Sequence, residues 1–574
     1  MNQQIQRAPT PNAGYSMTSL VGAALRARVE RRRRLLNNLD HWNERTAWIQ
    51  AAQLRKNLKA SASTVFGKQH GFGAIAAIKD DAEMINAYRA ALPINDWYVF
   101  KDHIEAMRER GEHDILWPGR VGHFAQTSGT TAGDKYIPVS EEMFRSNYLA
   151  SLDIFAHLIN RGVHPERMMG GRCLFLGGST DLDYNDEGIA TGDLSGLVTP
   201  LIKWPLSTIY SPGPEVALMS HWPDKIEAMA KMAIDQDIRF ISGMPSWALV
   251  LIDRVIEIAR SRGVDAMCAR DVWPNLEVFV HGGVNYTPFI ERMAIAFSGD
   301  PKIDFPCRQE LYPASEGFIA MQDRADEPGM RLLVDNGTFY EFVPREQIDD
   351  EHPEVLSCWE VQKGQQYVVV MSTNAGLWRY IIGDVVEFDT VPNGFDGRGG
   401  DGPARLRIVG RHRHFINAFG ENLIGEHIED GVSAGAAASG VTIGEFTAAP
   451  VYPSVHNRAG LEIAIEFAAP PSPEQIERFR AGLDENIRSM NVDYNTKRSD
   501  SLGMTEPTIT VLPMGTFHRW LDANGKLGGQ HKCPRCANHR EILNEILAAG
   551  GISTPNSAPV SATVETKDAT VGAP

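Results

Sequence analysis

The stretch QTSGTTAGDKYIP, residues 126–138, gathers glycines and hydroxyl side chains and ends on a lysine, a tyrosine, an isoleucine and a proline. A P-loop requires four residues between its glycines and then Lys-Ser/Thr, whereas three residues separate Gly129 from Gly133 here and Asp134 precedes Lys135. Backbone N–H groups and hydroxyls in such a loop can still donate to phosphate oxygens, and a lysine adds positive charge. We therefore predict a phosphate-binding loop of another class, with contacts from Thr127, Ser128, Gly129, Thr130, Thr131 and Lys135.

The composition is that of an acidic globular protein. The chain has 574 residues, of which 43% are hydrophobic, and a formal net charge of −16. Its length predicts at least two domains, and its negative charge disfavours nucleic acid and anionic membranes as partners. Six cysteines do not make a disulfide framework, and no apolar run approaches the roughly 18 residues of a membrane span. We expect a cytoplasmic protein with no nucleic-acid or membrane partner. The sequence does not decide the oligomeric state, and we lean towards a monomer.

Short apolar runs alternate with helical patterns through the middle third of the chain. The predicted strands lie at 172–178, 239–245, 276–283 and 302–313. The predicted helices between them lie at 223–236 and 246–263. This alternation predicts an α/β fold with parallel strands, whose C-terminal ends form a ligand crevice. Tight turns join the later strands and predict antiparallel pairing at 338–344, 366–391 and 404–411.

The stretch TSGTTAGDKYIP closely resembles the phosphate loop of the acyl-adenylate-forming superfamily, which includes firefly luciferase and the acyl-CoA synthetases. Further motifs narrow the likeness to the Gretchen Hagen family of acyl acid–amido synthetases, known from plant auxin conjugation and with bacterial relatives. In chain order these motifs are LPINDWYVF, LEVFVHGG, YPASEGF, GLWRYIIGDVVEF, GENLIGEH and GTFHRW…GGQHKCPR. The likeness extends over roughly residues 20–545, and several motifs in one fixed order are more specific than any one alone.

The resemblance implies an α/β fold with two domains. The first is a large N-terminal adenylate-forming domain of mixed sheets plus a β-barrel-like part, and the second is a smaller mobile α+β C-terminal domain. We place these domains at 17–411 and 412–549. The polar, proline-bearing ends at 1–16 and 550–574 are predicted to be disordered tails. The arginine run at 31–34 is predicted to be a solvated helix face.

The matching motifs also imply roles for residues around one nucleotide. In the superfamily, the aromatic residue that matches Tyr312 stacks on adenine, and the glutamate that matches Glu316 holds Mg²⁺ against the ATP phosphates. Ser315 lies beside Glu316 and is included among the nucleotide contacts. Gly282 and Gly283 would let the backbone pass along the adenine, since they lack a Cβ atom.

Later motifs complete the implied site. The likeness assigns the ribose hydroxyls to Asp384, because a carboxylate is a good acceptor for both of them. Arg411 and Asn417 are expected as nucleotide or hinge contacts, where the chain enters the C-terminal domain. Lys532 matches the lysine that reaches the carboxylate and the α-phosphate during adenylation.

The resemblance implies an AMP-forming ligase that uses ATP and Mg²⁺. It would convert a carboxylic acid into an acyl-adenylate with release of pyrophosphate and then pass the acyl group to an amine, in particular an amino acid. An acyl-CoA ligase-type enzyme and a non-enzymatic nucleotide-binding protein stay open as alternatives. The acid pocket is expected between about residues 150 and 250. The sequence identifies neither the acid nor the amine, and it does not decide whether auxin is a substrate.

Two short motifs predict different chemistry. GVSAG, residues 431–435, has the Gly-x-Ser-x-Gly pattern of a hydrolase with Ser433 as nucleophile, but a charged, helix-like segment precedes it instead of a strand. CPRC places Cys533 and Cys536 at a zinc-ligand spacing without a second Cys-x-x-Cys pair. We favour neither a hydrolase nor a zinc site.

Overall fold

The computed structural model describes most of the chain. The described residues are 6–9, 19–127, 135–177, 182–198, 206–219, 221–284, 286–327, 329–412, 415–417, 419–421, 423–453, 458–499, 503–524 and 533–552. Within them the strands form five sheets, and helices cover both faces of the largest one. No helix among these residues is long and apolar enough to cross a membrane.

An 11-stranded sheet lies at the centre of the molecule, and one half of it is parallel. The parallel strands lie in the spatial order β11 (Cys307–Ala314), β9 (Val278–Gly282), β8 (Ile238–Ser242), β4 (Arg172–Phe175) and β7 (Tyr210–Ser211). Because side chains alternate along a strand, Phe279 packs on one face of the sheet while Val278 and Val280 pack on the other. The predicted α/β fold with parallel strands is confirmed.

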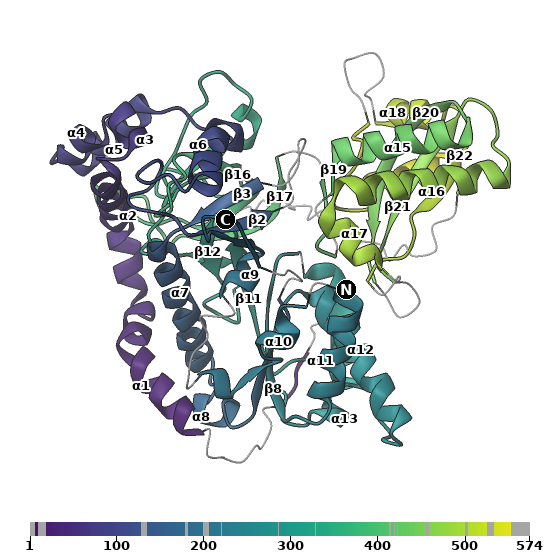
Figure 1. Ribbon diagram of the computed structural model, residues 1–574, viewed down its shortest axis with the longest axis horizontal. Helices are drawn as coiled ribbons and strands as arrows, with labels where there is room; N and C mark the ends of the chain where they lie inside the picture. The colour runs from purple at the N-terminus through teal and green to yellow at the C-terminus, as the bar shows by residue number, and fades with distance from the viewer. Residues whose placement is uncertain are drawn as a thin grey trace, which may run out of the picture.

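Helices form a layer on each side of these strands. The layer on the Phe279 face consists of α11 (Trp222–Ala233), α12 (Pro245–Ser261), α13 (Ala269–Val272) and α14 (Ile290–Ser298). The layer on the other face consists of α1 (Ser19–Leu36), α7 (Glu141–Asn160) and α8 (Pro165–Met168). Figure 1 shows α1 and α7 running side by side along one flank of the molecule. Short helices in the connections are α9 (Leu194–Val198) and α10 (Pro214–Ala217).

The other half of the same sheet is antiparallel. After β11 the strands lie in the order β12 (Gly317–Met321), β13 (Met330–Leu332), β17 (Arg405–Arg411), β16 (Tyr380–Thr390), β15 (Gln366–Ser372) and β14 (Phe339–Pro344). The hairpin predicted within 366–391 forms through pairing of β15 with β16. The strands expected to build a β-barrel-like part continue the central sheet, in which β14 is the last strand of the order found among the described residues.

A helical layer and a small sheet cover this antiparallel half. The helices are α2 (Leu39–Ser61), α3 (Val65–Gln69), α4 (Phe72–Ala77), α5 (Asp81–Ala91) and α6 (Trp97–Glu109). They share a core with Phe339 and Trp378 of the antiparallel region. The small sheet has the order β3 (Lys135–Val139), β2 (His123–Thr127), β6 (Ala190–Gly192) and β5 (Asp183–Tyr184). Its first two strands form the hairpin that carries the predicted phosphate loop.

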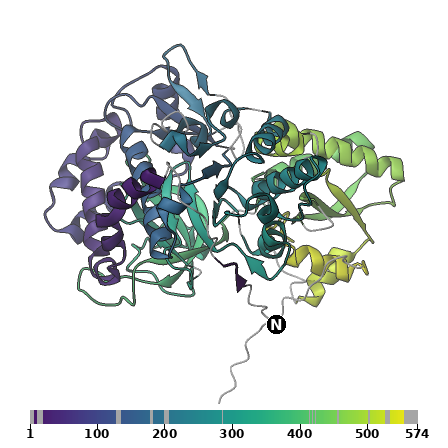
Figure 2. The same cartoon turned by 90° about the horizontal axis from the view of Figure 1, so that it is seen from below.

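The last part of the chain forms a separate lobe (Figure 1). Its sheet has the order β20 (Ile443–Val451), β21 (Gly460–Phe467) and β22 (Thr508–Leu512). Its helices are α15 (Gly425–Ser439), α16 (Pro473–Met490), α17 (Val492–Arg498), α18 (Thr516–Ala523) and α19 (Glu541–Ala549). The two-stranded sheet β18 (Phe415–Ile416) and β19 (Leu423–Ile424) lies between this lobe and β17 in sequence. Figure 2 shows the lobe on the opposite side of the central sheet from α1 and α2.

Residues 6–9 are ordered against the large part of the molecule, although the sequence predicts a disordered tail over 1–16. The short strand β1 (Gln6–Arg7) pairs in parallel with β10 (Ile303–Asp304). Arg7 also forms an ion pair with Asp304 at 2.6 Å. Backbone pairing and a half-buried charge contact hold this segment, and neither can be read from its polar composition. The remaining residues of the predicted tails lie outside the described residues, apart from 550–552.

The arginine run at 31–34 is only partly solvated, which corrects the prediction for it. Arg32 points inward and donates to Asp153 at 2.6 Å and to Asp335 at 2.6 Å. The two acids come from α7 and from the turn after β13, so Arg32 ties α1 to both. Arg34 is exposed, as predicted.

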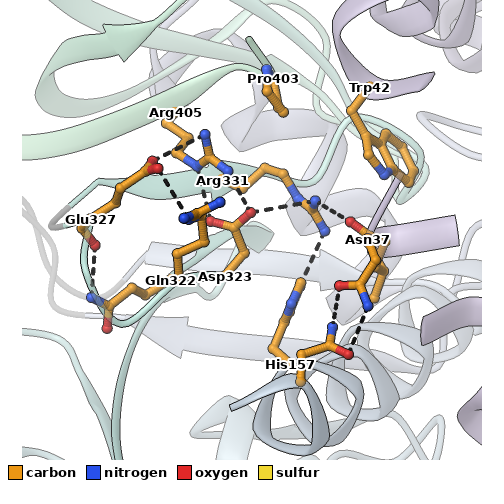
Figure 3. A network of polar contacts seen from close by, with 12 residues as sticks. Asn37, Trp42, His157, Gln322, Asp323, Glu327, Arg331, Pro403 and Arg405 are labelled. Carbon is orange, nitrogen blue, oxygen red and sulfur yellow. Dashed lines mark hydrogen bonds and ion pairs between the residues drawn. The ribbon is translucent and has the colours of Figure 1, made fainter. Parts of the chain in front are cut away.

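A buried polar network joins the N-terminal helices to the central sheet (Figure 3). Asp323 accepts two hydrogen bonds from Arg405, at 2.9 and 2.8 Å, and pairs with Arg331 at 3.4 Å. Arg331 donates in turn to the Leu36 carbonyl at 2.8 Å and lies 3.2 Å from Nε2 of His157. Burial alone would raise the pKa of Asp323, but the two arginines outweigh it and hold this pKa at about 2.

Replacing Asp323 with alanine is expected to lower the free energy of unfolding by about 3–5 kcal/mol, because two buried guanidinium groups would lose the carboxylate that they share, although Arg405 keeps its ion pair with Glu327. Urea denaturation followed by circular dichroism measures the change. The matched control is Asp326→Ala, since Asp326 is exposed and pairs with Arg324 of its own loop, and its loss should cost less than about 1 kcal/mol. Equal losses for the two variants would contradict this role of the network.

His157 is expected to make the protein less stable in mild acid. Burial, together with the charge of Arg331, lowers the pKa of His157 well below 6.5, so the folded state keeps this imidazole neutral. The unfolded state takes up a proton below about pH 6.5, so stability falls as the pH drops below that value, by about 1.4 kcal/mol at pH 5.5 for one such group. Denaturation at pH 5.5 and 7.5 should show a smaller pH difference for His157→Gln than for the wild type. An identical difference would exclude His157 as the cause.

Candidate active site

The candidate site lies where the parallel strands end. Gly282 is the last residue of β9, and a Cβ atom there would lie 2.4 Å from the Leu311 carbonyl oxygen of β11. Gly283 has a φ of +85°, which L side chains rarely adopt. Tyr312 is on the neighbouring strand, one residue past Leu311, and is 4% exposed. Gly282 therefore allows β9 to approach closely the strand that carries Tyr312, and Gly283 supplies the backbone conformation that follows.

Asp384 connects three strands of the central sheet. It lies on β16 directly opposite Arg411 on β17, whose Nε donates to Oδ1 of Asp384 at 2.8 Å. The hydroxyl of Tyr312 donates to Oδ2 at 2.5 Å. Burial and the adjacent carboxylate of Asp384 raise the pKa of Tyr312 well above 10, so this hydroxyl stays a donor. A carboxylate has about four acceptor positions, so Asp384 can accept two further hydrogen bonds, as a pair of ribose hydroxyls would require.

Glu316 forms, with Ser315, the turn between β11 and β12. Burial raises the pKa of Glu316, and the positive charges of Arg411 and Lys135 act in the opposite direction. The hydroxyl of Tyr380 is hydrogen-bonded to Glu316, and burial together with this carboxylate raises the pKa of Tyr380 well above 10. Glu316 is thus an 8% exposed carboxylate within electrostatic reach of two cations.

The position of Lys135 follows from the hairpin that carries it. It is the first residue of β3 and pairs with Thr127 at the end of β2. Thr127 and Lys135 therefore mark the two ends of the predicted phosphate loop. Ser128, Gly129, Thr130 and Thr131 lie outside the described residues, as does Lys532. The structure brings Lys135, Tyr312, Glu316, Asp384 and Arg411 into one electrostatic group.

The fit of Mg²⁺ can be tested on the donor set. No group of three or more His, Cys, Asp or Glu side chains capable of holding a metal occurs among the described residues. Mg²⁺ is commonly held by one or two carboxylates together with substrate phosphates and water. Glu316, near the cation that the phosphate loop carries, fits that pattern as a single carboxylate ligand.

Asn95 lies beside the start of β16, a position that its sequence context does not reveal. Its backbone N–H donates to the Arg379 carbonyl at 2.7 Å, and its carbonyl accepts from Ile381 at 2.8 Å. Its side chain donates to the Trp378 carbonyl at 2.9 Å. Asn95 thus fixes the chain on both sides of Tyr380, the partner of Glu316. In the sequence, Asn95 is marked by the motif LPINDWYVF, which indicates the family but does not predict this contact.

Asn417 lies at the contact between the C-terminal lobe and the strand ends. Its side-chain amide donates to the Gly283 carbonyl at 3.3 Å, and its backbone N–H donates to Oδ1 of Asn538 at 2.7 Å. Nearby, Nε1 of Trp247 on α12 donates to the Phe419 carbonyl at 3.2 Å. The segment after β17 therefore contacts the glycine segment at the end of β9.

The two rival motifs have other structural roles. Ser433 lies in the middle of α15, and its hydroxyl donates to the Glu429 carbonyl one turn earlier, so GVSAG does not form a strand–turn–helix elbow. Cys533 and Cys536 are both buried, form no disulfide among the described residues, and pack in different hydrophobic clusters. Their segment runs beside β20, where the Ala448 N–H donates to the Arg535 carbonyl at 2.9 Å.

Replacing Asp384 with asparagine is expected to raise the KM for ATP about 10- to 100-fold. The change removes the charge that Arg411 needs and turns one of two accepting oxygens into a donor, which is the loss of about one charged hydrogen bond. Steady-state kinetics measure the effect. The control is Asp389→Asn, on the same strand, where Asp389 pairs with the partly exposed Arg407. A KM for ATP that is unchanged in Asp384→Asn would exclude the carboxylate from nucleotide binding.

Comparison with protein families gives one consistent result along the chain. The model of the GH3 family N-terminal domain matches residues 35–212 and 182–302. The models of the GH3 family central and C-terminal domains match residues 331–395 and 426–541. These segments together account for more than half of the 574 residues.

Curated relatives are distant in sequence. The chain is 23% identical over 299 residues to an indole-3-acetic acid-amido synthetase, GH3.3 of Arabidopsis thaliana, covering 49% of this chain and 47% of that protein. It is 22% identical over 554 residues to a probable indole-3-acetic acid-amido synthetase, GH3.1 of Arabidopsis thaliana, covering 82% and 86%. It is 25% identical over 264 residues to the jasmonoyl–L-amino acid synthetase JAR4 of Nicotiana attenuata, covering 44% and 43%. The matched part thus spans less than half of the first and third of these relatives.

A solved structure shares the fold. The GH3.15 acyl acid amido synthetase in complex with 2,4-DB superposes with a TM-score of 0.53 at 15% identity, over 92% of this chain and 96% of that one. At this level of identity the likeness concerns the fold alone.

Proposed function

The chain belongs to the GH3 family, and from this premise we propose that it is an ATP-dependent acyl acid–amido synthetase. It activates a carboxylic acid as an acyl-adenylate with release of pyrophosphate, and it then transfers the acyl group to an amine with release of AMP. The observation that carries the proposal is the hydrogen-bonded group of Tyr312, Asp384 and Arg411, which joins β11, β16 and β17 beside Glu316. Three motifs that are distant in the chain thus meet at one place, and we propose that the nucleotide binds there.

We assign the nucleotide contacts as follows. The ring of Tyr312, fixed by its hydrogen bond to Asp384, supports the adenine, and the segment of Gly282 and Gly283 passes beside it. Asp384 accepts from the ribose hydroxyls. The phosphates bind Lys135 and the loop that is rich in hydroxyl side chains and glycines. The remaining nucleotide contacts are Thr127, Ser128, Gly129, Thr130, Thr131, Ser315, Arg411 and Asn417.

The chemistry of the first step is governed by charge. A carboxylate has to approach the α-phosphate of a polyanion, and two like charges at about 4 Å repel by several kcal/mol at a surface-like dielectric. Lys135 near the outer phosphates and Lys532 near the reacting carboxylate would offset this repulsion and stabilise the transition-state oxygens. Mg²⁺ bound to Glu316 would add positive charge on the phosphates.

The second step needs an amine where Lys532 stood in the first. We propose that residues 412–549 form a domain that moves about a hinge after Arg411 and so withdraws Lys532 when the acceptor enters. The contact of Asn417 with the Gly283 carbonyl supports a hinge next to the nucleotide. Domain 17–411 then holds the adenylate throughout the reaction.

The substrates are proposed from chemistry and from the names of relatives. An acyl-adenylate is an electrophile that an amine can attack. One relative is named an indole-3-acetic acid-amido synthetase and another a jasmonoyl–L-amino acid synthetase. We propose a small carboxylic acid and an amino acid as substrates. Free coenzyme A would be the acceptor in the alternative, an acyl-CoA ligase.

A screen of acids against amino acids, read as pyrophosphate release, tests the proposal and identifies the substrate pair at the same time. The expected result is release that requires ATP, Mg²⁺ and an acid, together with an amide product that appears only when an amino acid is added. Formation of a thioester from coenzyme A, with no amide from any amino acid, would replace the amido synthetase by an acyl-CoA ligase.

A further inference from the structure

Arg308 contacts residues on both sides of the glycine segment, Gly282 and Gly283, at the end of β9. His281 comes just before Gly282, and Tyr286 comes three residues after Gly283. The rings of His281 and Tyr286 stack with centroids 4.2 Å apart and an interplanar angle of 22°. One guanidinium nitrogen of Arg308 lies 3.1 Å from Nε2 of His281, and its central carbon lies 4.0 Å from the Tyr286 ring centroid.

Arg308 is itself held in place from two directions. It lies on β11, and the parallel register of β11 with β9 sets it opposite Phe279, two residues before His281. Its Nε donates to Oδ2 of Asp304 at 3.0 Å. The same oxygen of Asp304 accepts from Arg7 on β1 at 2.6 Å. The ordered N-terminal segment therefore supports the acid that orients Arg308.

The rings of His281 and Tyr286 depend on Arg308, because other polar atoms of these rings lack hydrogen-bond partners among the described residues that could hold them in place. Nδ1 of His281 and the hydroxyl of Tyr286 are buried and have no hydrogen-bond partner within the described part of the chain. Burial, and then the charges of Arg308 and Arg7, lower the pKa of His281 well below 6.5. The neutral imidazole can therefore accept at Nε2 from the guanidinium, which only donates. Without Arg308, Nε2 would be a third polar atom left without a partner.

We propose that Arg308 is a positioning residue for adenine recognition. By holding His281 and Tyr286 together, it fixes the backbone of Gly282 and Gly283 between them. This role rests on the proposed function, in which the segment of Gly282 and Gly283 borders the adenine. The ring stacking and the cation–π contact fix the two ends of this segment, whose glycines have little preference for any one backbone conformation. Arg308 acts on the base through the backbone and touches no reacting atom.

Such a role predicts a selective effect on the nucleotide. A looser segment weakens the contacts with the base, so ATP binding falls and the preference for ATP over GTP narrows. A residue with a merely structural role would lower stability without changing the choice of base.

The experiment measures binding of ATP and GTP with Mg²⁺ by titration calorimetry, using the full chain and four variants. Arg308→Met removes the contacts with His281 and Tyr286, and Arg308→Lys keeps the positive charge without the planar guanidinium group. Tyr286→Leu removes the aromatic ring that stacks on His281. The matched control is Arg292→Met, because Arg292 has the same 19% side-chain exposure as Arg308 and also pairs with one aspartate. Thermal melting confirms folding.

We expect the Kd of Arg308→Met for ATP to be about tenfold higher than that of the wild type, and its preference for ATP over GTP to be about tenfold smaller. Arg308→Lys should give values between those of Arg308→Met and the wild type. Arg292→Met should bind as the wild type does. If Arg308→Met does not fold, Tyr286→Leu and Arg308→Lys carry the same comparison. If the wild type binds ATP and the folded Arg308 variants bind it with a Kd within twofold of the wild-type value, the role of Arg308 is overturned but the proposed function is not. A wild type without ATP binding would overturn the proposed function, and the role of Arg308 with it.

Discussion

Replacing Glu316 with glutamine is expected to reduce acid-dependent pyrophosphate formation by about 10³-fold. The side chain keeps its size in the turn between β11 and β12, but it loses the negative charge that would hold Mg²⁺ against the phosphates. Removing one group that stabilises transition-state charge costs about 10²- to 10³-fold, and here loss of the metal ion would add to the loss of the group. Initial rates at saturating ATP and several Mg²⁺ concentrations measure the effect.

The control for this variant is Glu387→Gln. Glu387 lies on β16 of the same sheet and pairs with Arg407 on β17, away from the turn that carries Glu316. Its loss should change the rate less than twofold, and both variants should melt near the wild type. Raised Mg²⁺ should partly restore Glu316→Gln if the carboxylate binds the ion. A Glu316→Gln variant of normal activity would remove Mg²⁺ binding from this residue.

Replacing Lys532 with alanine is expected to slow adenylate formation about 10²- to 10³-fold and to leave the second step nearly unchanged. The lysine would offset the charge of the carboxylate and the α-phosphate in the first step, whereas the amine attacks a neutral acyl carbon in the second. Pyrophosphate exchange measures the first step. Amide formation from a chemically synthesised acyl-adenylate measures the second step without the first.

The matched control is Lys363→Ala, because Lys363 is an exposed lysine of the large part that pairs with Asp401. Its loss should affect neither step. Equal slowing of both steps by Lys532→Ala would contradict a lysine that acts only in adenylation. Adenylation at the wild-type rate would favour a different cation, or the non-enzymatic nucleotide-binding alternative.

The local parts of the fold could be predicted from the sequence because their signals are local. The apolar run at 276–283, which ends in two glycines, becomes β9 with Gly282 as its last residue. The apolar spacing at 246–263 becomes α12. The tight turns at 366–391 give the antiparallel pair β15 and β16. In each case the periodicity and the turn residues carry the information.

Contacts between distant segments could not be predicted in the same way. Local motifs indicate Tyr312 and Asp384 as candidate site residues, but their hydrogen bond joins residues 72 positions apart and depends on the strand order β11-β12-β13-β17-β16. Arg32 looked like part of a charged surface because its partner Asp153 is 121 residues away. Residues 6–9 looked disordered because β10, their partner, lies near residue 303. Only the folded topology supplies these neighbours.

Oxygen transfer from the acid to AMP tests the central claim most directly. An acid with ¹⁸O in its carboxyl group is converted to the amide in the presence of ATP, Mg²⁺ and an amino acid, and the nucleotide product is analysed by mass spectrometry. If the acid is activated as an acyl-adenylate, one carboxyl oxygen bonds to the α-phosphorus and stays there when the amine displaces AMP, so AMP gains one ¹⁸O atom. Unlabelled AMP, or label in inorganic phosphate with ADP as the nucleotide product, would contradict the account.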